Sequence, residues 1–213
     1  MYQPVPPIVC KAPCIITAME PVSAFVLAGG KSTRMGQDKA FLSVEGVTML
    51  ERSLALVRSV TEQVWISGDA SKFSSFAPVV EDIYPDHGPL GGIHAALRAT
   101  ATDLDLMLAV DLPLVDVRLL RYLLYIADES GSVVTVCEAG GRLHPLCAVY
   151  RREFAELAER ALIRGQNKID VLFQETRTRI ISEAQLNGIG FSAKMFLNVN
   201  SPIDLRTLTD SKS

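Results

Sequence analysis

The chain has 213 residues, with 21 Lys or Arg and 24 Asp or Glu, so its formal net charge at pH 7 is −3. This length is typical of one domain whose core is large enough to fold alone. The small acidic excess provides no general attraction for a polyanion, and no apolar run reaches the roughly 18 residues that a membrane span requires. We therefore expect neither a nucleic-acid partner nor a membrane partner.

The first 20 residues differ in composition from the rest. Pro4, Pro6, Pro7 and Pro13 interrupt them, and they lack the extended apolar region of a signal peptide. We expect a disordered leader over 1–20 and a single domain over 21–210. The four cysteines (Cys10, Cys14, Cys137 and Cys147) do not have the spacing of a zinc site or a disulfide scaffold, which favours reduced thiols in a cytoplasmic enzyme.

The first predicted element is a buried strand that ends in a glycine turn. The apolar run 24–27 leads directly into Gly29 and Gly30. Cations, hydroxyls and a further glycine follow, at Lys31, Ser32, Thr33, Arg34, Gly36 and Lys39. Loops with free backbone N–H groups and nearby cations bind phosphate. The alternative is a solvated basic loop without a ligand.

Two common glycine-loop motifs do not fit this segment. A Walker A loop that ends at Gly30, Lys31 and Ser32 requires a glycine at the position of Phe25. The dinucleotide fingerprint requires G-x-G-x-x-G, whereas the two glycines here are adjacent. The loop is therefore neither a P-loop nor an NAD-binding turn.

After this loop, helical and strand patterns alternate along the chain. We expect a helix at 48–60, strands at 63–67 and 77–80, a Gly-Pro bend at 88–92, a helix at 93–100, a strand at 105–110, a helix at 117–127, strands at 133–136 and 146–150 around a Gly140-Gly141 turn, a helix at 151–164, an edge strand at 178–181, and a last helix at 203–208. This order predicts an α/β fold with a mostly parallel twisted sheet, helices on both faces and a small β-hairpin.

Two carboxylates follow predicted strands. Asp82 comes after the strand at 77–80, and Asp111 comes directly after the strand at 105–110. Open α/β sheets bind ligands at the carboxyl ends of their strands, and a triphosphate site needs a hard oxygen ligand for Mg²⁺. The structural alternative for Asp111 is that it caps the following helix.

The segment LAGGKSTRMGQDK, from Leu27 to Lys39, resembles the signature loop of the nucleotidyltransferases related to molybdenum cofactor guanylyltransferase. The resemblance covers about residues 22–208. It includes the GPLGG segment at 88–92, the His144-Pro145 pair and the NVNSP ending at 198–202. In several relatives the second strand ends in Asn, whereas this chain has Ser67.

The resemblance implies a single-domain Rossmann-like nucleotidyltransferase fold and transfer of GMP from GTP to the molybdopterin-bound molybdenum cofactor, with release of pyrophosphate. It implies Lys39, Arg34 and Asp111 as catalytic residues, with Asp111 binding Mg²⁺. The implied nucleotide-binding residues are Leu27, Ala28, Gly29, Gly30, Lys39, Ser67, Asp82, Gly88 and Asp111. The implied acceptor-binding residues are His144, Lys168, Asn198 and Asn200. The partners are then GTP, molybdopterin and proteins that deliver the cofactor or receive the product, such as molybdoenzymes.

Several alternatives remain open. A cytidylyltransferase acting on the same cofactor, or on a sugar or polyol phosphate, would have the same fold, although its loop usually reads LAAG. A nucleotide-binding regulator without activity would not need Asp111 or Lys39. His144 and Lys168 could be an ordinary strand residue and a solvated lysine. For the favoured reading we expect backbone groups of the Leu27–Gly29 turn and of 88–92 to recognise guanine.

Overall fold

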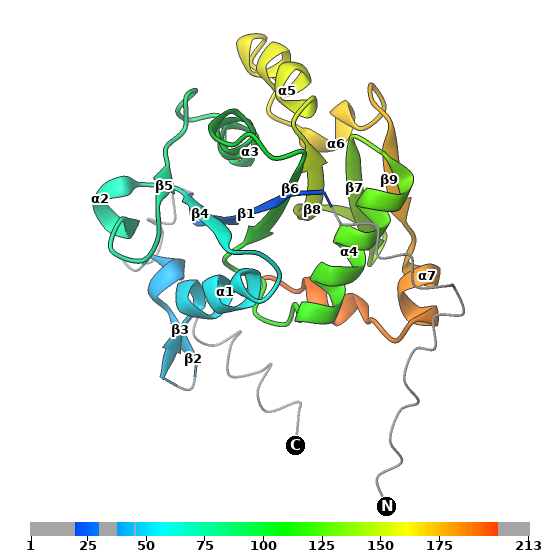
Figure 1. Cartoon of the computed structure of the whole chain (residues 1–213), viewed down its shortest axis with the longest axis horizontal. Coiled ribbons are helices and arrows are strands. Elements are labelled where there is room, and N and C mark those ends of the chain that lie inside the picture. The colour runs from blue at the N-terminus through cyan, green and yellow to red at the C-terminus, as the bar shows by residue number, and fades with distance from the viewer. Residues whose placement is uncertain (1–19, 30–37, 45, 200–213) are drawn as a thin grey trace, which may run out of the picture.

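The computed structural model describes residues 20–29, 38–44 and 46–199 (Figure 1). Within them a seven-stranded mixed sheet has the order β5-β4-β1-β6-β8-β7-β9. Only β8 runs antiparallel to its two neighbours, so the predicted mostly parallel sheet is confirmed. The strands are β1 (Val22–Leu27), β4 (Gln63–Ser67), β5 (Val79–Val80), β6 (Leu104–Ala109), β7 (Val134–Ala139), β8 (Arg142–Arg151) and β9 (Thr178–Ile181).

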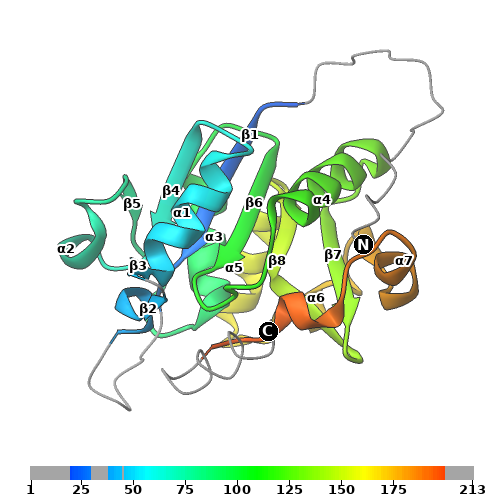
Figure 2. The same cartoon turned by 90° about the horizontal axis from the view of Figure 1, so that it is seen from below.

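Helices cover both faces of this sheet, as predicted (Figures 1 and 2). On one face lie α1 (Met49–Arg58) and α4 (Val117–Ser130); on the other lie α3 (Pro89–Ala99) and α5 (Phe154–Ile163). Alternation along β1 serves both layers, because Ala24 and Val26 pack on the α1 side while Phe25 and Leu27 pack on the α3 side. The shorter elements are η2 (Lys39–Phe41), the pair β2 (Ser43–Val44) and β3 (Val47–Thr48), α2 (Ala70–Phe73), α6 (Ile169–Leu172), α7 (Glu183–Gly188) and η3 (Ala193–Phe196).

Local sequence determines where several of these elements begin. Thr48 and Glu51 form a capping box at the start of α1, and Asp116 caps α4 by accepting from the backbone N–H groups of Arg118 and Leu119. Gly140 and Gly141 have φ angles of +60° and +70°, which suit the tight turn of the β7–β8 hairpin. The predicted hairpin is therefore confirmed.

The start of α3 differs from the prediction. The helix begins at Pro89 rather than at residue 93, with Gly88 as its N-cap at a φ of +62°. Gly91 and Gly92 therefore lie inside the helix and do not form a bend. A Cβ atom on Gly92 would be 2.7 Å from the Ser67 Oγ atom, so the glycines allow α3 to approach β4 closely.

Another helix also starts at a different residue from the one predicted. The predicted helix at 151–164 starts only at Phe154, because β8 continues through Arg151. We did not predict β2, β3, α2 or α7, whose short segments carry weak periodicity. The leader 1–19, the helix at 203–208 and the end of the predicted domain lie outside the described residues.

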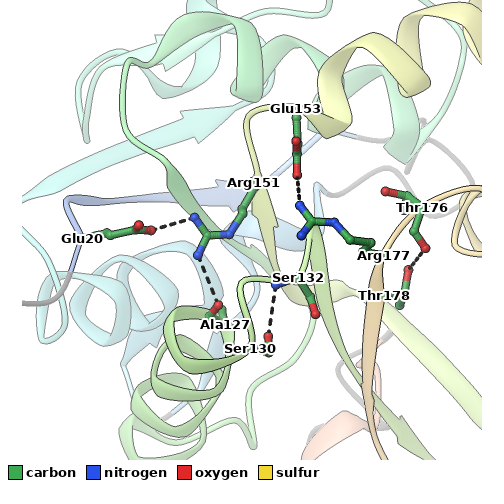
Figure 3. Close-up of polar contacts among 9 residues, drawn as sticks. All are labelled: Glu20, Ala127, Ser130, Ser132, Arg151, Glu153, Thr176, Arg177 and Thr178. Carbon is green, nitrogen blue, oxygen red and sulfur yellow. Dashed lines mark hydrogen bonds and ion pairs between the residues drawn. The ribbon is translucent and has the colours of Figure 1, made fainter.

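Arg151 links separate segments at the end of the sheet where strands β1 and β6 begin (Figure 3). Its Nη1 atom lies 2.7 Å from Glu20 Oε2, and its Nη2 atom donates to the Ala127 carbonyl of α4 at 3.4 Å. Nearby, Arg177 and Glu153 form a more exposed ion pair at 3.0 Å. Within the described ranges, no helix is long and apolar enough to cross a membrane.

Candidate functional site

A cavity of about 560 Å³ lies at the carboxyl ends of β1, β4 and β6, a volume suited to a small-molecule ligand. Eight of the nine predicted nucleotide-binding residues line it: Leu27, Ala28, Gly29, Lys39, Ser67, Asp82, Gly88 and Asp111. The ninth, Gly30, and the predicted catalytic Arg34 lie outside the described residues. The cavity also includes Pro89 and Gly92 of the 88–92 segment, and Asp38 and Asp86, which we had not assigned to the site.

The glycine turn after β1 is hydrogen-bonded to its neighbouring strands. Ala28 and Gly29 donate their N–H groups to the Ser67 carbonyl at 2.9 and 3.1 Å, and the Leu27 carbonyl accepts from Val110 N at 3.1 Å. The two N–H groups are therefore not available to a ligand. The prediction that backbone groups of this turn recognise the base is then restricted to its carbonyl oxygens.

Lys39 and Asp111 meet at one side of the cavity, although they come from different parts of the chain. Lys39 begins η2, and its Nζ atom lies 3.6 Å from Asp111 Oδ2. Burial raises the pKa of Asp111 while the Lys39 charge opposes that rise. The helix after Asp111 is capped by Asp116, so the alternative in which Asp111 serves as that cap is wrong.

Asp82 forms a second acidic point on the cavity wall. Its carboxylate makes no hydrogen bond to a described residue, and desolvation raises its pKa. A Cβ atom on Gly91 would be 3.2 Å from Asp82 Oδ2, which shows how closely the carboxylate approaches α3. The two carboxylate oxygens of Asp82 are therefore available to bind a cation or to accept hydrogen bonds from N–H groups of a ligand.

The site has donors that fit Mg²⁺, because Asp111 and Asp82 both line the cavity. Carboxylate oxygens are ligands that Mg²⁺ prefers. Among the described residues, no group of three or more His, Cys, Asp or Glu is arranged to hold a metal ion. The protein would therefore supply one or two carboxylates, with phosphate and water oxygens as the remaining ligands, a common arrangement for Mg²⁺.

A smaller cavity of about 160 Å³ adjoins the first and shares Ala109, Asp111 and Leu146 with it. The predicted acceptor residues His144 and Asn198 line it. The backbone of Val199 donates to the Asp111 carbonyl at 2.9 Å, which brings the C-terminal segment to the end of β6. The two cavities therefore meet at Asp111.

His144 is oriented by two contacts. Its Nε2 atom lies 3.0 Å from the Ala139 carbonyl, and its ring stacks on Phe196 with centroids 4.2 Å apart. Burial lowers the pKa of His144, which favours the neutral ring. These contacts fix the orientation of the ring at the smaller cavity, and its role in binding the acceptor stays a prediction.

The other two predicted acceptor residues are not placed in this cavity. Lys168 is exposed at the N-cap of α6 and lines neither cavity. Its neighbour Asn167 contacts His87 at 2.8 Å, close to Asp86 and Gly88 on the rim of the larger cavity. Asn200 lies outside the described residues. Arg142, which we did not predict, does line the smaller cavity.

A mostly parallel sheet with a glycine turn, a lysine and an aspartate around a cavity at its strand ends is the arrangement expected of a nucleotidyltransferase. The family model described as MobA-like NTP transferase domain matches residues 24–180, and the chain belongs to this family.

Named relatives agree with this assignment. The chain is 31% identical to the probable molybdenum cofactor guanylyltransferase of Carboxydothermus hydrogenoformans, over 89% of this chain and 96% of that protein. It is also 31% identical to the molybdenum cofactor guanylyltransferase of Desulfosudis oleivorans, over 88% of this chain and 94% of that protein. The crystal structure of molybdopterin-guanine dinucleotide biosynthesis protein A from Archaeoglobus fulgidus superposes with a TM-score of 0.78 at 27% identity, covering 90% of this chain and all of that one.

Proposed function

We propose that this protein transfers GMP from GTP to the terminal phosphate of the molybdopterin-bound molybdenum cofactor and releases pyrophosphate. The observation that carries the proposal is the pair of adjoining cavities that share Asp111. The larger cavity would bind GTP and the smaller one the acceptor phosphate. The names of the relatives support this choice of substrates.

The reaction needs positioning and charge neutralisation rather than a protein nucleophile, because the attacking phosphate is already an anion. Lys39 would stabilise charge that develops on the α-phosphate. Gly30 and Arg34 would bind the leaving pyrophosphate. Mg²⁺, when bound through Asp111, would supply further charge stabilisation at the phosphates.

We assign guanine recognition to acceptors in the larger cavity. Guanine presents N1–H and N2–H donors, and the candidates to accept from them are the carboxylates of Asp82 and Asp86 and the carbonyls of the Ala28–Gly29 turn. A site built for such hydrogen bonds rejects a base that leaves them unmade. Ser67, which replaces the Asn of several relatives, would contact the ribose or base more weakly.

The decisive experiment supplies Mg²⁺, molybdenum-loaded molybdopterin and equal concentrations of GTP and CTP, and measures pyrophosphate together with the dinucleotide product. We expect a ratio of kcat/KM values favouring GTP by about a hundredfold, which corresponds to roughly 2.7 kcal/mol. Equal use of both nucleotides, or a preference for CTP, would contradict the guanylyltransferase assignment and favour a cytidylyltransferase. The proposed roles of the phosphate-binding residues would not be affected.

We also infer a cytoplasmic reaction. Cys137 and Cys147, the two cysteines within the described residues, are free and buried, which suits a reducing compartment. The product would then pass to molybdoenzymes. A protein partner that delivers the cofactor or receives the product is part of the same proposal.

A further inference from the structure

The smaller cavity contains a cation to which the sequence pattern assigned no role. Among the described residues that line it, Arg142 is the only Lys or Arg. Its guanidinium makes no ion pair or hydrogen bond with any described residue. Its positive charge contributes to the lowered pKa of His144, after the larger effect of burial, so the guanidinium lies near that ring. The smaller cavity thus has an exposed guanidinium, with no direct partner among the described residues, beside a neutral imidazole.

The hairpin that carries Arg142 is restrained on both sides. Arg142 pairs with Ala139 across the turn, and Gly140 donates its N–H group to Glu183 Oε2 at 2.7 Å. On the same strand as Arg142, His144 contacts the Ala139 carbonyl of β7 and stacks on Phe196. These contacts come from α7 and η3 as well as from the hairpin itself. The backbone of Arg142 is therefore positioned before any ligand binds.

The charges of the site make a cation necessary at this place. Asp111 lines both cavities, and Lys39 is the Lys or Arg in the described lining of the larger one. A phosphate monoester in the smaller cavity would approach both the Asp111 carboxylate and the nucleotide phosphates. Without a positive charge on the acceptor side, it would be repelled by both. An arginine suits this position, since its planar guanidinium binds phosphate oxygens in a bidentate manner.

We propose that Arg142 binds the phosphate monoester of the acceptor and directs one phosphate oxygen towards the nucleotide cavity across Asp111. This inference rests on the proposed function and adds the residue that recognises the nucleophile. It assigns the acceptor cation to the β7–β8 hairpin, whereas the family resemblance had implied Lys168. Arg142 and Lys39 would then act on opposite sides of the transfer.

The test compares Arg142→Gln with the unsubstituted protein in steady-state assays with GTP and molybdenum-loaded molybdopterin, and in direct fluorescence titrations of molybdopterin. We expect KM and Kd for the acceptor to rise at least tenfold, while KM for GTP stays within twofold. Arg142→Lys should recover part of the loss. Arg164→Gln, which removes a positive charge from an exposed residue outside both cavities, is the matched control and should leave both substrates unaffected.

Each other outcome has a defined meaning. If the unsubstituted protein forms the dinucleotide but Arg142→Gln binds the acceptor normally, the role of Arg142 is wrong and the proposed function remains. If Lys168→Gln alone weakens acceptor binding, the cation belongs to α6 and not to the hairpin. If the unsubstituted protein forms no product and binds no molybdopterin, the proposed function fails, and the role of Arg142 fails with it.

Discussion

Asp111 is the residue at which the two cavities meet, and its environment prepares it for a cation. Desolvation raises the pKa of its carboxyl group, and Lys39 lies 3.6 Å away. A carboxylate that is poorly solvated gains more from a nearby positive charge than one in water. These features are compatible with the Mg²⁺-binding role proposed for Asp111.

Replacing Asp111 by Asn should abolish metal-dependent turnover without unfolding the protein. The lost carboxylate removes charge stabilisation of several kcal/mol, so we expect kcat to fall by at least about a hundredfold. Stability should change little, because removal of a poorly solvated charge offsets the loss of the ion pair with Lys39. Turnover at different Mg²⁺ concentrations, together with a thermal melt, checks this. Near-normal turnover at ordinary Mg²⁺ would remove Asp111 from the metal site.

Gly92 shows how one missing side chain shapes the cavity. In Gly92→Ala the new Cβ atom would be 2.7 Å from Ser67 Oγ, closer than real contacts allow. We expect a loss of about 1–3 kcal/mol of unfolding free energy, measured by denaturant titration. Gly188→Ala is the control, since nothing lies within 4 Å of that Cβ position. The double variant Ser67→Ala/Gly92→Ala should regain stability; if it does not, another contact causes the loss.

At the scale of elements, α2 supports the segment that carries Lys39. Asp38 accepts from Ala40 N at the start of η2, and its other carboxylate oxygen lies 3.1 Å from Lys72 of α2. Phe41 also packs on Phe73, with ring centroids 5.8 Å apart. A short helix after β4 therefore positions η2, although it contributes no residue to the cavity lining.

Lys72→Met should reduce kcat several-fold and leave KM for GTP nearly unchanged, because Lys39 would be less well positioned for the chemical step. The Lys72 side chain is half exposed, so its ion pair is worth about 1 kcal/mol or less and the melting temperature should shift little. Lys72→Arg, which keeps the charge, should restore kcat. If Lys72→Met and the unsubstituted protein have equal kcat, α2 has no role in positioning.

At the scale of the whole molecule, a buried polar cluster around Asp105 lies at the end of the sheet opposite to the site. Asp105 lies near the start of β6, at the opposite end of that strand from Asp111. It is fully buried and accepts hydrogen bonds from Thr100 and Thr102 through Oδ1, while its Oδ2 atom has no partner. Desolvation, only partly offset by those hydroxyls, raises the pKa of Asp105 from 3.8 to about 7.

This cluster predicts a pH dependence of stability. Between pH 4 and 7 the unfolded chain loses the Asp105 proton while the folded protein retains it, so stability is highest below the unfolded pKa and falls as pH rises to about 7. The full effect corresponds to about 4 kcal/mol. The Asp105→Asn variant has no carboxyl group to titrate at this position, so it should not lose this stability as pH rises. The difference in unfolding free energy, variant minus wild type, should therefore increase from pH 4 to pH 8. A constant difference would show that Asp105 stays ionised.

Much of the fold was predictable because it depends on local patterns. The apolar run before Gly29 and the strand before Asp111 identify β1 and β6, and glycines identify the β7–β8 turn. Parallel strands place their carboxyl ends at one edge of a sheet, so the residues after them were expected to come together. The same reasoning brought Asp82 to the cavity, whereas Ser67 was named from the family resemblance.

By itself the sequence determined the order of most helices and strands, the phosphate-loop signature with Lys39, and Asp111 after a strand, since these are properties of short segments. Only the tertiary structure decided the start of α3, the support of η2 by Lys72 and the presence of Arg142 in the second cavity. Gly92 is needed where α3 packs closely on β4, and Arg142 lines the cavity because η3 and α7 restrain its hairpin. Such contacts join residues that are distant in the chain, and no local periodicity or propensity encodes which of them will meet.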